Sequence, residues 1–394
     1  FDPNTANKFV YCYKDSSNSR SGTAVVGTVS GTSISFGTAV VFNTGNTSIS
    51  SVSFDPNTAN SFVITYKDND TSDYGVAIAG TLSGTSVSFG TEVVFRAANT
   101  NYPLVSFDPN TAGKFVVVYR GDTSPWYGRA IVGTVSGTSV SFGTEVVFNS
   151  GSTYYTSLSF DPNNANKFVV VYRDASNSYF GTAIVGTLSG TSVSFGTAVV
   201  FNSGATSYPG VAFDPNTAGK FVVGYMNDGN SNYGTAIVGT LSGTSVSFGT
   251  AVVFRASTSY QVSLAFDPNI AGKFVTLYTD GDSPASCMVI VGTVSGTSVS
   301  FGTAVAFNSG SSYDHAIAFD PSSVGKFVVI YNDGANSSYG TARVGQLAGT
   351  VVSPNLTSTN FLGTSQAAYT DTQTASIMLQ GSISTNQTGL TIGS

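Results

Sequence analysis

The chain has 394 residues, of which 41% are hydrophobic and only 9% are charged, and its net charge is −6. So little charge excludes a long coiled coil, and the mildly acidic balance lacks the basic face that phosphate contacts need, so we expect no nucleic-acid partner. The 28 Phe and 20 Tyr argue against disorder. No apolar run reaches the length of a membrane span, so we expect no membrane insertion.

The chain is a tandem repeat. The tripeptide Phe-Asp-Pro returns at a constant interval of 53 residues, without insertion or deletion, and each copy carries a Phe and a Tyr at matching places, such as Phe168 and Tyr172. A fixed period of this size indicates a solenoid, a propeller or an array. The copies start at residues 1, 54, 107, 160, 213, 266 and 319.

Each copy predicts four strands. In the copy around residue 160 these cover residues 156–160, 167–173, 181–188 and 191–201, because each is short, rich in Val, Phe, Tyr and Thr, and bounded by turn residues. No helical period is present. Four antiparallel strands repeated radially are typical of a propeller blade. The sequence therefore predicts an all-β, seven-bladed β-propeller of seven 53-residue four-stranded repeats over residues 1–352, with a β-solenoid as the alternative.

The two ends of the repeat array are incomplete. The last copy departs from the pattern, residues 353–394 form a non-repeat C-terminal segment, and the first copy lacks most of its first strand. A closed propeller pairs its last blade with its first so that no sheet edge stays open. We predict that residues 350–382 supply the outer strand of the last blade, the inner strand of the first, or both; residues upstream are the other source. The chain looks like a fragment, and residues 353–394 are candidates for leading into a further domain.

Sequence variation gathers on one predicted face. The loops between second and third strands and the connections between blades differ among copies, whereas the Asp-Pro-Asn-Thr-Ala and Ser-Gly-Thr-Ser turns barely change. Variety on one face of a rigid scaffold is typical of binding, with relaxed constraint on exposed loops as the alternative. The Asp of Asp-Pro is interpreted as a turn cap.

Aromatic residues on that face are the candidate binding residues. Aromatic rings beside Asn, Asp and Ser suit sugar rings, although an aromatic that precedes Gly in several copies also fits packing between blades. Trp126 is the only tryptophan and the strongest contact candidate. The candidates are Tyr74, Trp126, Tyr127, Tyr179, Phe180, Tyr233, Tyr339, Tyr102, Tyr155 and Tyr208; Tyr154, Tyr260 and Tyr313 lie in the same connections.

Chemistry beyond binding has weak support in the sequence. Weak calcium candidates are Asp68, Asp70, Asp73, Asp280 and Asp282, whose oxygen-rich loops lack a full ligand set. His315 is expected to be an exposed polar residue, and Cys12 and Cys287 have no base nearby in sequence. The two glutamates share one outer-strand position, away from a central channel. We therefore expect no metal, no cofactor, no catalytic residue and no enzyme.

The repeat also resembles a known group of proteins. The run YGTAIVGTLSGTSVSFGTAVVFNSG, present with small changes in six copies, and residues 353–394, which include NLTSTNFLGTSQAAYTDTQTASIMLQ, resemble tandem-repeat virion structural and tail-fibre-like proteins of marine phages of the cyanophage type. The resemblance implies a structural role in a virion appendage, an extracellular location, and other virion proteins and a host-surface glycan or receptor as partners. A homo-oligomer is compatible with it. The main alternative is a secreted or cell-surface bacterial adhesin or lectin.

Overall fold

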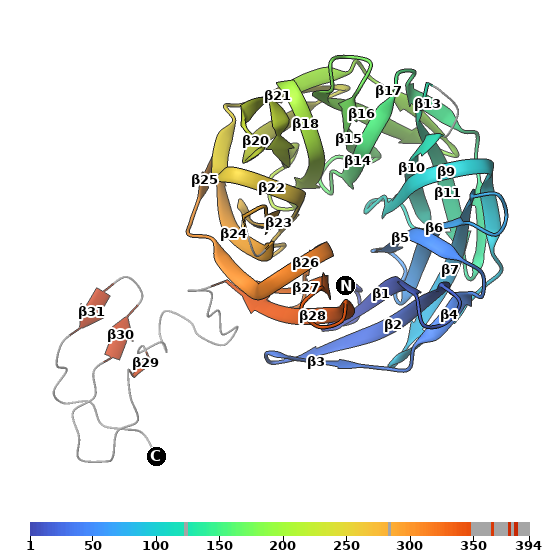
Figure 1. Ribbon diagram of the computed structural model, residues 1–394, viewed down its shortest axis with the longest axis horizontal. Helices are drawn as coiled ribbons and strands as arrows, with labels where there is room; N and C mark the ends of the chain where they lie inside the picture. Colours follow the sequence, from blue (N-terminus) through green and yellow to red (C-terminus); the bar gives the residue numbers. More distant parts are fainter. Residues whose placement is uncertain (122–124, 283–284, 348–363, 366–376, 380–381, 385–394) are drawn as a thin grey trace, which may run out of the picture. The chain divides into compact units, whose positions relative to one another are not determined.

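A computed structural model describes residues 1–121, 125–282, 285–347, 364–365, 377–379 and 382–384. The chain divides into two compact parts, Phe1–Ala348 and Gly349–Ser394. The first part is a ring of antiparallel sheets that follow one another in chain order around a central axis (Figure 1). Among the described residues the only helix is the short 3-10 turn η1 (Asp228–Asn230), so the prediction of an all-β fold is confirmed.

The second and third strands of each repeat form the centre of one sheet, which we call a unit and number 1 to 7 in chain order. The second strands are apolar on both faces because neighbouring sheets cover both sides. These are β1 Lys8–Asp15, β6 Ser61–Asp68, β10 Lys114–Gly121, β15 Lys167–Asp174, β19 Lys220–Asn227, β23 Lys273–Asp280 and β27 Lys326–Asp333. The third strands are β2 Ser21–Ser30, β7 Tyr74–Ser83, β11 Gly128–Ser136, β16 Phe180–Ser189, β20 Tyr233–Ser242, β24 Ser286–Ser295 and β28 Tyr339–Gln346.

The fourth strand is broken, whereas the sequence predicted one strand over residues 191–201. The chain pairs with β16 as β17 (Ser192–Phe195), leaves the sheet, and pairs again from Val199. At the break, a Cβ on Gly196 would lie 2.0 Å from the carbonyl oxygen of Thr244 in the next unit, so the two backbones touch there. The corresponding first halves in other units are β3 Ser33–Phe36, β8 Ser86–Phe89, β12 Ser139–Phe142, β21 Ser245–Phe248 and β25 Ser298–Phe301.

The predicted connections between units are strands rather than loops. In four places the second half of a fourth strand continues without interruption into the inner strand of the next unit, which pairs with that unit's second strand. These long strands are β9 Val93–Phe107, β18 Val199–Phe213, β22 Val252–Phe266 and β26 Val305–Phe319. Elsewhere the two parts are separate, as β4 Val40–Asn43 with β5 Thr47–Phe54 and β13 Val146–Asn149 with β14 Thr153–Phe160.

The repeated Phe and Gly positions meet within each unit. Phe168 on β15 faces Gly186 on β16 in the antiparallel register. A Cβ on Gly186 would lie 2.1 Å from Cζ of the Phe168 ring, so the ring occupies the space that the glycine leaves. The same pairing recurs at each repeat, for example between Phe115 and Gly133. This contact explains why a strand-disfavouring glycine recurs inside every third strand.

The hydrophobic core lies between neighbouring units. One cluster joins Val169 and Val185 of unit 4 with Phe221 and Ile237 of unit 5, all at most 4% exposed. Clusters of similar make-up fill the other junctions. Each unit therefore buries both of its faces only because it has a neighbour on either side, which is the stability logic of a repeat protein.

The Asp-Pro-Asn turns tie each unit to the next. Asp55 Oδ1 accepts a hydrogen bond from the backbone N–H of Asn57 (2.9 Å), and its Oδ2 accepts one from the N–H of Gly113 in the next unit (2.8 Å). The Asn57 side chain donates to the carbonyl of Pro109 (3.1 Å). The predicted turn cap is present, and the same carboxylate is also an inter-unit clamp. Matching clamps join Asp161 to Gly219, Asp214 to Gly272 and Asp267 to Gly325.

Unit 7 packs against unit 1. Phe9 and Val29 of unit 1 share an apolar cluster with Val328 of unit 7. Within the described residues β1 has no inner strand beside it and β28 has no fourth strand beside it. The closing strand expected from residues 350–382 falls largely outside the described residues, so it and the count of seven blades stay predictions. In that segment β29 (Thr364–Ser365), β30 (Ile377–Leu379) and β31 (Ser382–Ser384) pair with one another.

Candidate functional site

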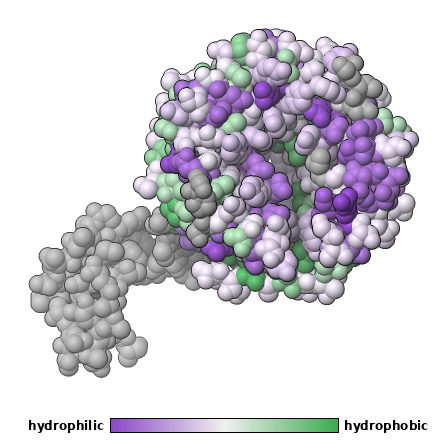
Figure 2. Space-filling view, viewed as in Figure 1, coloured by the Kyte–Doolittle hydropathy of each residue, from purple (hydrophilic) through white to green (hydrophobic). Residues whose placement is uncertain are grey.

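The candidate site lies on the face that carries the variable loops. The long strands pass from the outside to the inside of the ring on the side that Figure 1 presents. Figure 2, in the same view, shows hydrophilic residues gathered where Figure 1 places β6 and β7, and a hollow at the ring centre. Tyr102, Tyr155 and Tyr208 were predicted in loops, but they lie inside β9, β14 and β18.

These three tyrosines occupy an unusual backbone position. Tyr102, Tyr155 and Tyr208 have φ values of 55°, 49° and 52°, at irregularities where the inner strand changes register against the second strand. Gln261 and Asp314 hold the same position with φ of 52° and 49°. A left-handed conformation is unfavourable for a bulky residue by about 1–2 kcal/mol. The bulge re-aims each side chain at the start of an inner strand.

The first aromatic cluster surrounds Arg120, the last residue but one of β10. Its guanidinium carbon lies 5.4 Å from the ring centre of Tyr102, 5.8 Å from that of Trp126 and 4.9 Å from that of Tyr154. Trp126 and Tyr154 also contact each other edge to face at 5.7 Å. Trp126 is 37% exposed and Tyr102 43% exposed. The cluster joins unit 3 to the inner strand of unit 4, and its rings face solvent.

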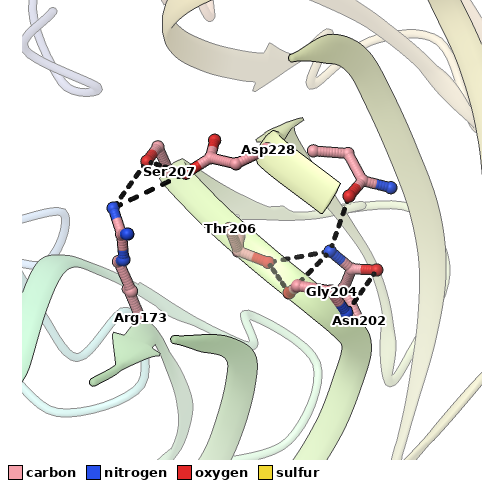
Figure 3. A network of polar contacts seen from close by, with 7 residues as sticks. Arg173, Asn202, Gly204, Thr206, Ser207 and Asp228 are labelled. Carbon is pink, nitrogen blue, oxygen red and sulfur yellow. Dashed lines mark hydrogen bonds and ion pairs between the residues drawn. The ribbon is translucent and has the colours of Figure 1, made fainter. Parts of the chain in front are cut away.

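The second aromatic cluster surrounds Arg173, at the same repeat position in unit 4. The guanidinium carbon lies 4.5 Å from the ring centre of Tyr179 and 6.0 Å from that of Tyr155. Arg173 donates to Ser207 Oγ (2.8 Å) and forms an ion pair with Asp228 of unit 5 (3.6 Å), while Ser207 donates to Asp228 (2.8 Å). Figure 3 shows the contacts of Arg173 with Ser207 and Asp228. An internal carboxylate thus occupies the second cluster.

A neighbouring polar network shapes the connection next to Arg173. Asn202 donates through Nδ2 to Thr206 Oγ1 (2.9 Å) and to Asn227 Oδ1 (3.2 Å), and its Oδ1 accepts from the N–H of Gly204 (3.4 Å) (Figure 3). The Asn-Ser-Gly pattern of the blade connections is thereby a structural motif, and part of the predicted variable face serves folding.

Sequence reasoning missed the two arginines as candidate site residues, and it named Tyr154 only as an aromatic residue in the same connections. The repeat position of Arg120 and Arg173 could have indicated them. This position directly precedes the variable loop, and in the other repeats it is occupied by Lys, Met, Thr or Asn. An arginine in two adjacent copies, each followed by an aromatic residue six positions later, marks the pair. The recurring second-strand pattern concealed it.

The other predicted aromatic residues do not join these clusters. Tyr74, Phe180 and Tyr233 begin third strands and are half-buried, and Tyr74 packs against the core between units 1 and 2. Tyr127 lies directly before β11, half-buried, and 5.6 Å separate its ring centre from the guanidinium carbon of Arg129. Tyr339 is 63% exposed at the start of β28. Tyr208 contacts Tyr155 ring to ring at 4.6 Å and so borders the second cluster.

Glu145 binds two arginines at the junction of units 2 and 3. Arg96 pairs with it at 2.7 Å, Arg129 pairs with its other oxygen, and the Tyr119 hydroxyl donates to it. Burial disfavours the charged form of Glu145, but the hydrogen bonds from Tyr119 and Arg96 and the two positive charges outweigh burial and lower its pKa. This glutamate is an inter-unit clamp.

The aspartates considered for calcium have protein donors. Asp68 accepts from Thr71 (2.9 Å), Asp70 accepts from the N–H of Asn46 (2.9 Å), and Asp73 pairs with Lys67 (3.0 Å). Asp280 and Asp282 both pair with Arg255, at 2.8 and 2.6 Å. Among the residues that the structure describes, no three His, Cys, Asp or Glu side chains gather as metal ligands.

His315 differs from its predicted place. It was expected to be an exposed polar residue, but it lies in β26, half-buried, and both ring nitrogens are enclosed without a partner among the described residues. Burial lowers its pKa to about 4. Burial also raises the pKa of the Cys12 and Cys287 thiols to about 11, so both are protonated at neutral pH.

Comparisons with known proteins show which solved structures have a similar fold. No family model and no curated protein matches the chain. Among solved structures, the BP39L lectin from Burkholderia pseudomallei matches with a TM-score of 0.59 and 10% identity, over 88% of this chain and 97% of that one. A triple arginine-to-alanine mutant of AofleA from Arthrobotrys oligospora matches with a TM-score of 0.51 and 8% identity, over 87% of each chain. The ring described above is a β-propeller of repeated four-stranded units. In its described part, no helix has the length and apolarity needed to cross a membrane.

Proposed function

We propose that this chain is a carbohydrate-binding β-propeller that presents its loop face to host-surface glycans, as a non-enzymatic part of a phage virion appendage. The observation that carries the proposal is the pair of exposed aromatic clusters around Arg120 and Arg173. Flat rings stack on the apolar faces of sugars, and guanidinium groups donate to their oxygens. One structural neighbour is named a lectin, which is compatible with this role.

The glycan-binding part has a direct test. The recombinant chain is applied to an array of bacterial surface glycans, together with a Trp126→Ala variant. Retention of specific glycans by the wild type and their loss by the variant, at unchanged unfolding midpoint, is the expected result. Absence of binding to every glycan would refute carbohydrate recognition.

The virion part has a separate test. It is supported by the likeness of the repeat and of residues 353–394 to phage tail-fibre-like proteins. Peptide mass spectrometry on density-purified phage particles, beside the host secretome of the same culture, is expected to find peptides of this chain with the particles at fixed stoichiometry. Recovery from cells or secreted material alone would favour the second candidate, a secreted or surface bacterial adhesin, which one bacterial structural neighbour supports.

A further inference from the structure

The two aromatic clusters occupy equivalent positions in neighbouring repeats. Arg120 and Arg173 are one 53-residue period apart, as are Tyr102 and Tyr155, and Trp126 and Tyr179. In both, one arginine lies against a bulged tyrosine and against an aromatic residue from the variable loop. Two repeats of one chain thus build the same arginine and aromatic frame.

The clusters differ in the next unit. Beside Arg173, the next unit supplies Ser207 and Asp228, and the Asp228 carboxylate lies 3.6 Å from the guanidinium. One period earlier, the position of Asp228 is Ala175, and that of Ser207 is Tyr154. The Arg120 cluster therefore has a third aromatic ring, that of Tyr154, and the sequence position that carries the carboxylate in the next repeat is an alanine here.

Arg120 has no anionic partner among the described residues. No hydrogen bond or ion pair is found between its guanidinium and another residue in the described ranges, and three aromatic rings lie against it. Its Nε is enclosed and lacks an acceptor among them. Guanidinium groups bind carboxylates in a planar, two-pronged geometry, and the surrounding rings reduce competition from water. Beside Arg173, Asp228 supplies such a carboxylate from within the chain.

We propose that the Arg120 cluster binds a sugar carboxylate, that of a uronic acid in an acidic glycan, with the sugar ring stacked on Trp126 or Tyr102. Trp126 and Tyr102 are the residues proposed to supply the stacking surface, because they are 37% and 43% exposed. This inference rests on the proposed glycan binding and adds the class of sugar and its location.

Isothermal titration with a galacturonate oligosaccharide, and with its methyl ester, tests the proposal. We expect one site per chain for the acid. The ester is expected to bind at least about tenfold more weakly, because a hydrogen bond to a charged group contributes more than one to a neutral group. Arg120→Gln is expected to lose binding of the acid to a similar degree.

Two further variants test the internal comparison without removing a residue of the Arg120 cluster. Ala175→Asp places in unit 4 the carboxylate that unit 5 carries, so it is expected to pair with Arg120 and weaken binding of the acid about tenfold. Asp228→Ala removes the internal carboxylate beside Arg173, so it is expected to raise the stoichiometry from one site to two. Unfolding midpoints of all variants are measured in parallel.

The outcomes separate this inference from the proposed function. Equal binding of acid and ester, or acid binding that Arg120→Gln and Ala175→Asp leave unchanged, overturns the carboxylate site while carbohydrate recognition stands. Binding of neutral glycans alone has the same meaning. No binding of any glycan on the array overturns both.

Discussion

The two faces of the ring carry residues of different kinds. On the Asp-Pro face the side chains repeat from unit to unit, and at several junctions the Asp and Asn of the turn bond to the backbone of the next unit, as Asp55 does to Gly113 and Asn57 does to Pro109. On the loop face, corresponding positions hold different residues, as Arg120 and Met226 do. A residue that joins every junction must stay the same along the chain, whereas a residue that faces solvent is free to differ. Repetition therefore marks assembly, and its interruption marks candidate recognition.

The largest expected effect is on the free energy of unfolding, through the Phe–Gly contact inside each unit. Gly186→Val places its side chain in the Phe168 ring, since even a Cβ there would lie 2.1 Å from Cζ. We expect a loss of about 3 kcal/mol in the free energy of unfolding, measured by denaturant titration. Gly190→Ala is the control: its φ is 60° but nothing lies within 4 Å of its Cβ position, so we expect only about 1 kcal/mol. Equal effects would contradict the packing account.

The Asp-Pro face offers a matched pair of carboxylates. Asp55 clamps the N–H of Gly113, but the Oδ2 of Asp108 is buried without a partner among the described residues. Both also cap their own turns. We expect Asp55→Asn to lose about 2 kcal/mol, because a charged hydrogen bond across the junction is lost, and Asp108→Asn to lose clearly less. Thermal unfolding measures both, and a larger effect at Asp108 would refute the clamp.

On the loop face the expected effect is on binding. Trp126→Ala is expected to weaken glycan binding about tenfold at unchanged stability, because exposed rings at a binding site contribute more than 1 kcal/mol. Tyr339→Ala is the matched control, since Tyr339 is exposed but outside both arginine clusters, and it is expected to bind as the wild type does. If the two variants bind alike, the binding surface is not the Trp126 cluster.

The last expected effect concerns pH. Burial lowers the pKa of His315 to about 4, while the unfolded chain has a value of about 6.5. The unfolded state binds more protons between these values, so the free energy of unfolding decreases as pH falls from about 6.5 toward 4. Urea titrations at about pH 7 and about pH 5 are expected to show a larger decrease for the wild type than for His315→Gln. Equal decreases in the free energy of unfolding for the wild type and His315→Gln would mean that His315 is exposed to solvent.

The repeat made much of the fold predictable. Second strands such as β15 differ from their predicted bounds by a single residue, because Phe168 and Tyr172 belong to a pattern present in every copy. The fourth strand and the blade connections were wrong, because their form depends on contacts with another unit, such as that of Gly196 with Thr244. Local propensity contains no information about such a neighbour.

The candidate site was predictable only in part. Exposed aromatic residues such as Trp126 and Tyr179 stand out in the sequence because they interrupt the repeat. Their grouping around Arg120 and Arg173 could not be predicted from the sequence, because each group combines residues of a second strand, a loop and the inner strand of the next unit. The left-handed φ of Tyr102 and Tyr155 was also invisible, since bulky residues rarely adopt it.

By itself, the sequence determined the period, the strand content and the all-β class, because alternation, turns and a Phe–Gly register are short-range properties of each repeat. Only the tertiary structure decided which side of a junction supplies an anion. Asp228 and Ala175 occupy equivalent positions in the sequence. Whether a residue at this position forms an ion pair depends on the arginine of the preceding unit, as Asp228 does with Arg173. The physical reason is that charge pairing acts across the few ångströms between units, whereas the chain separates the partners by about one full repeat.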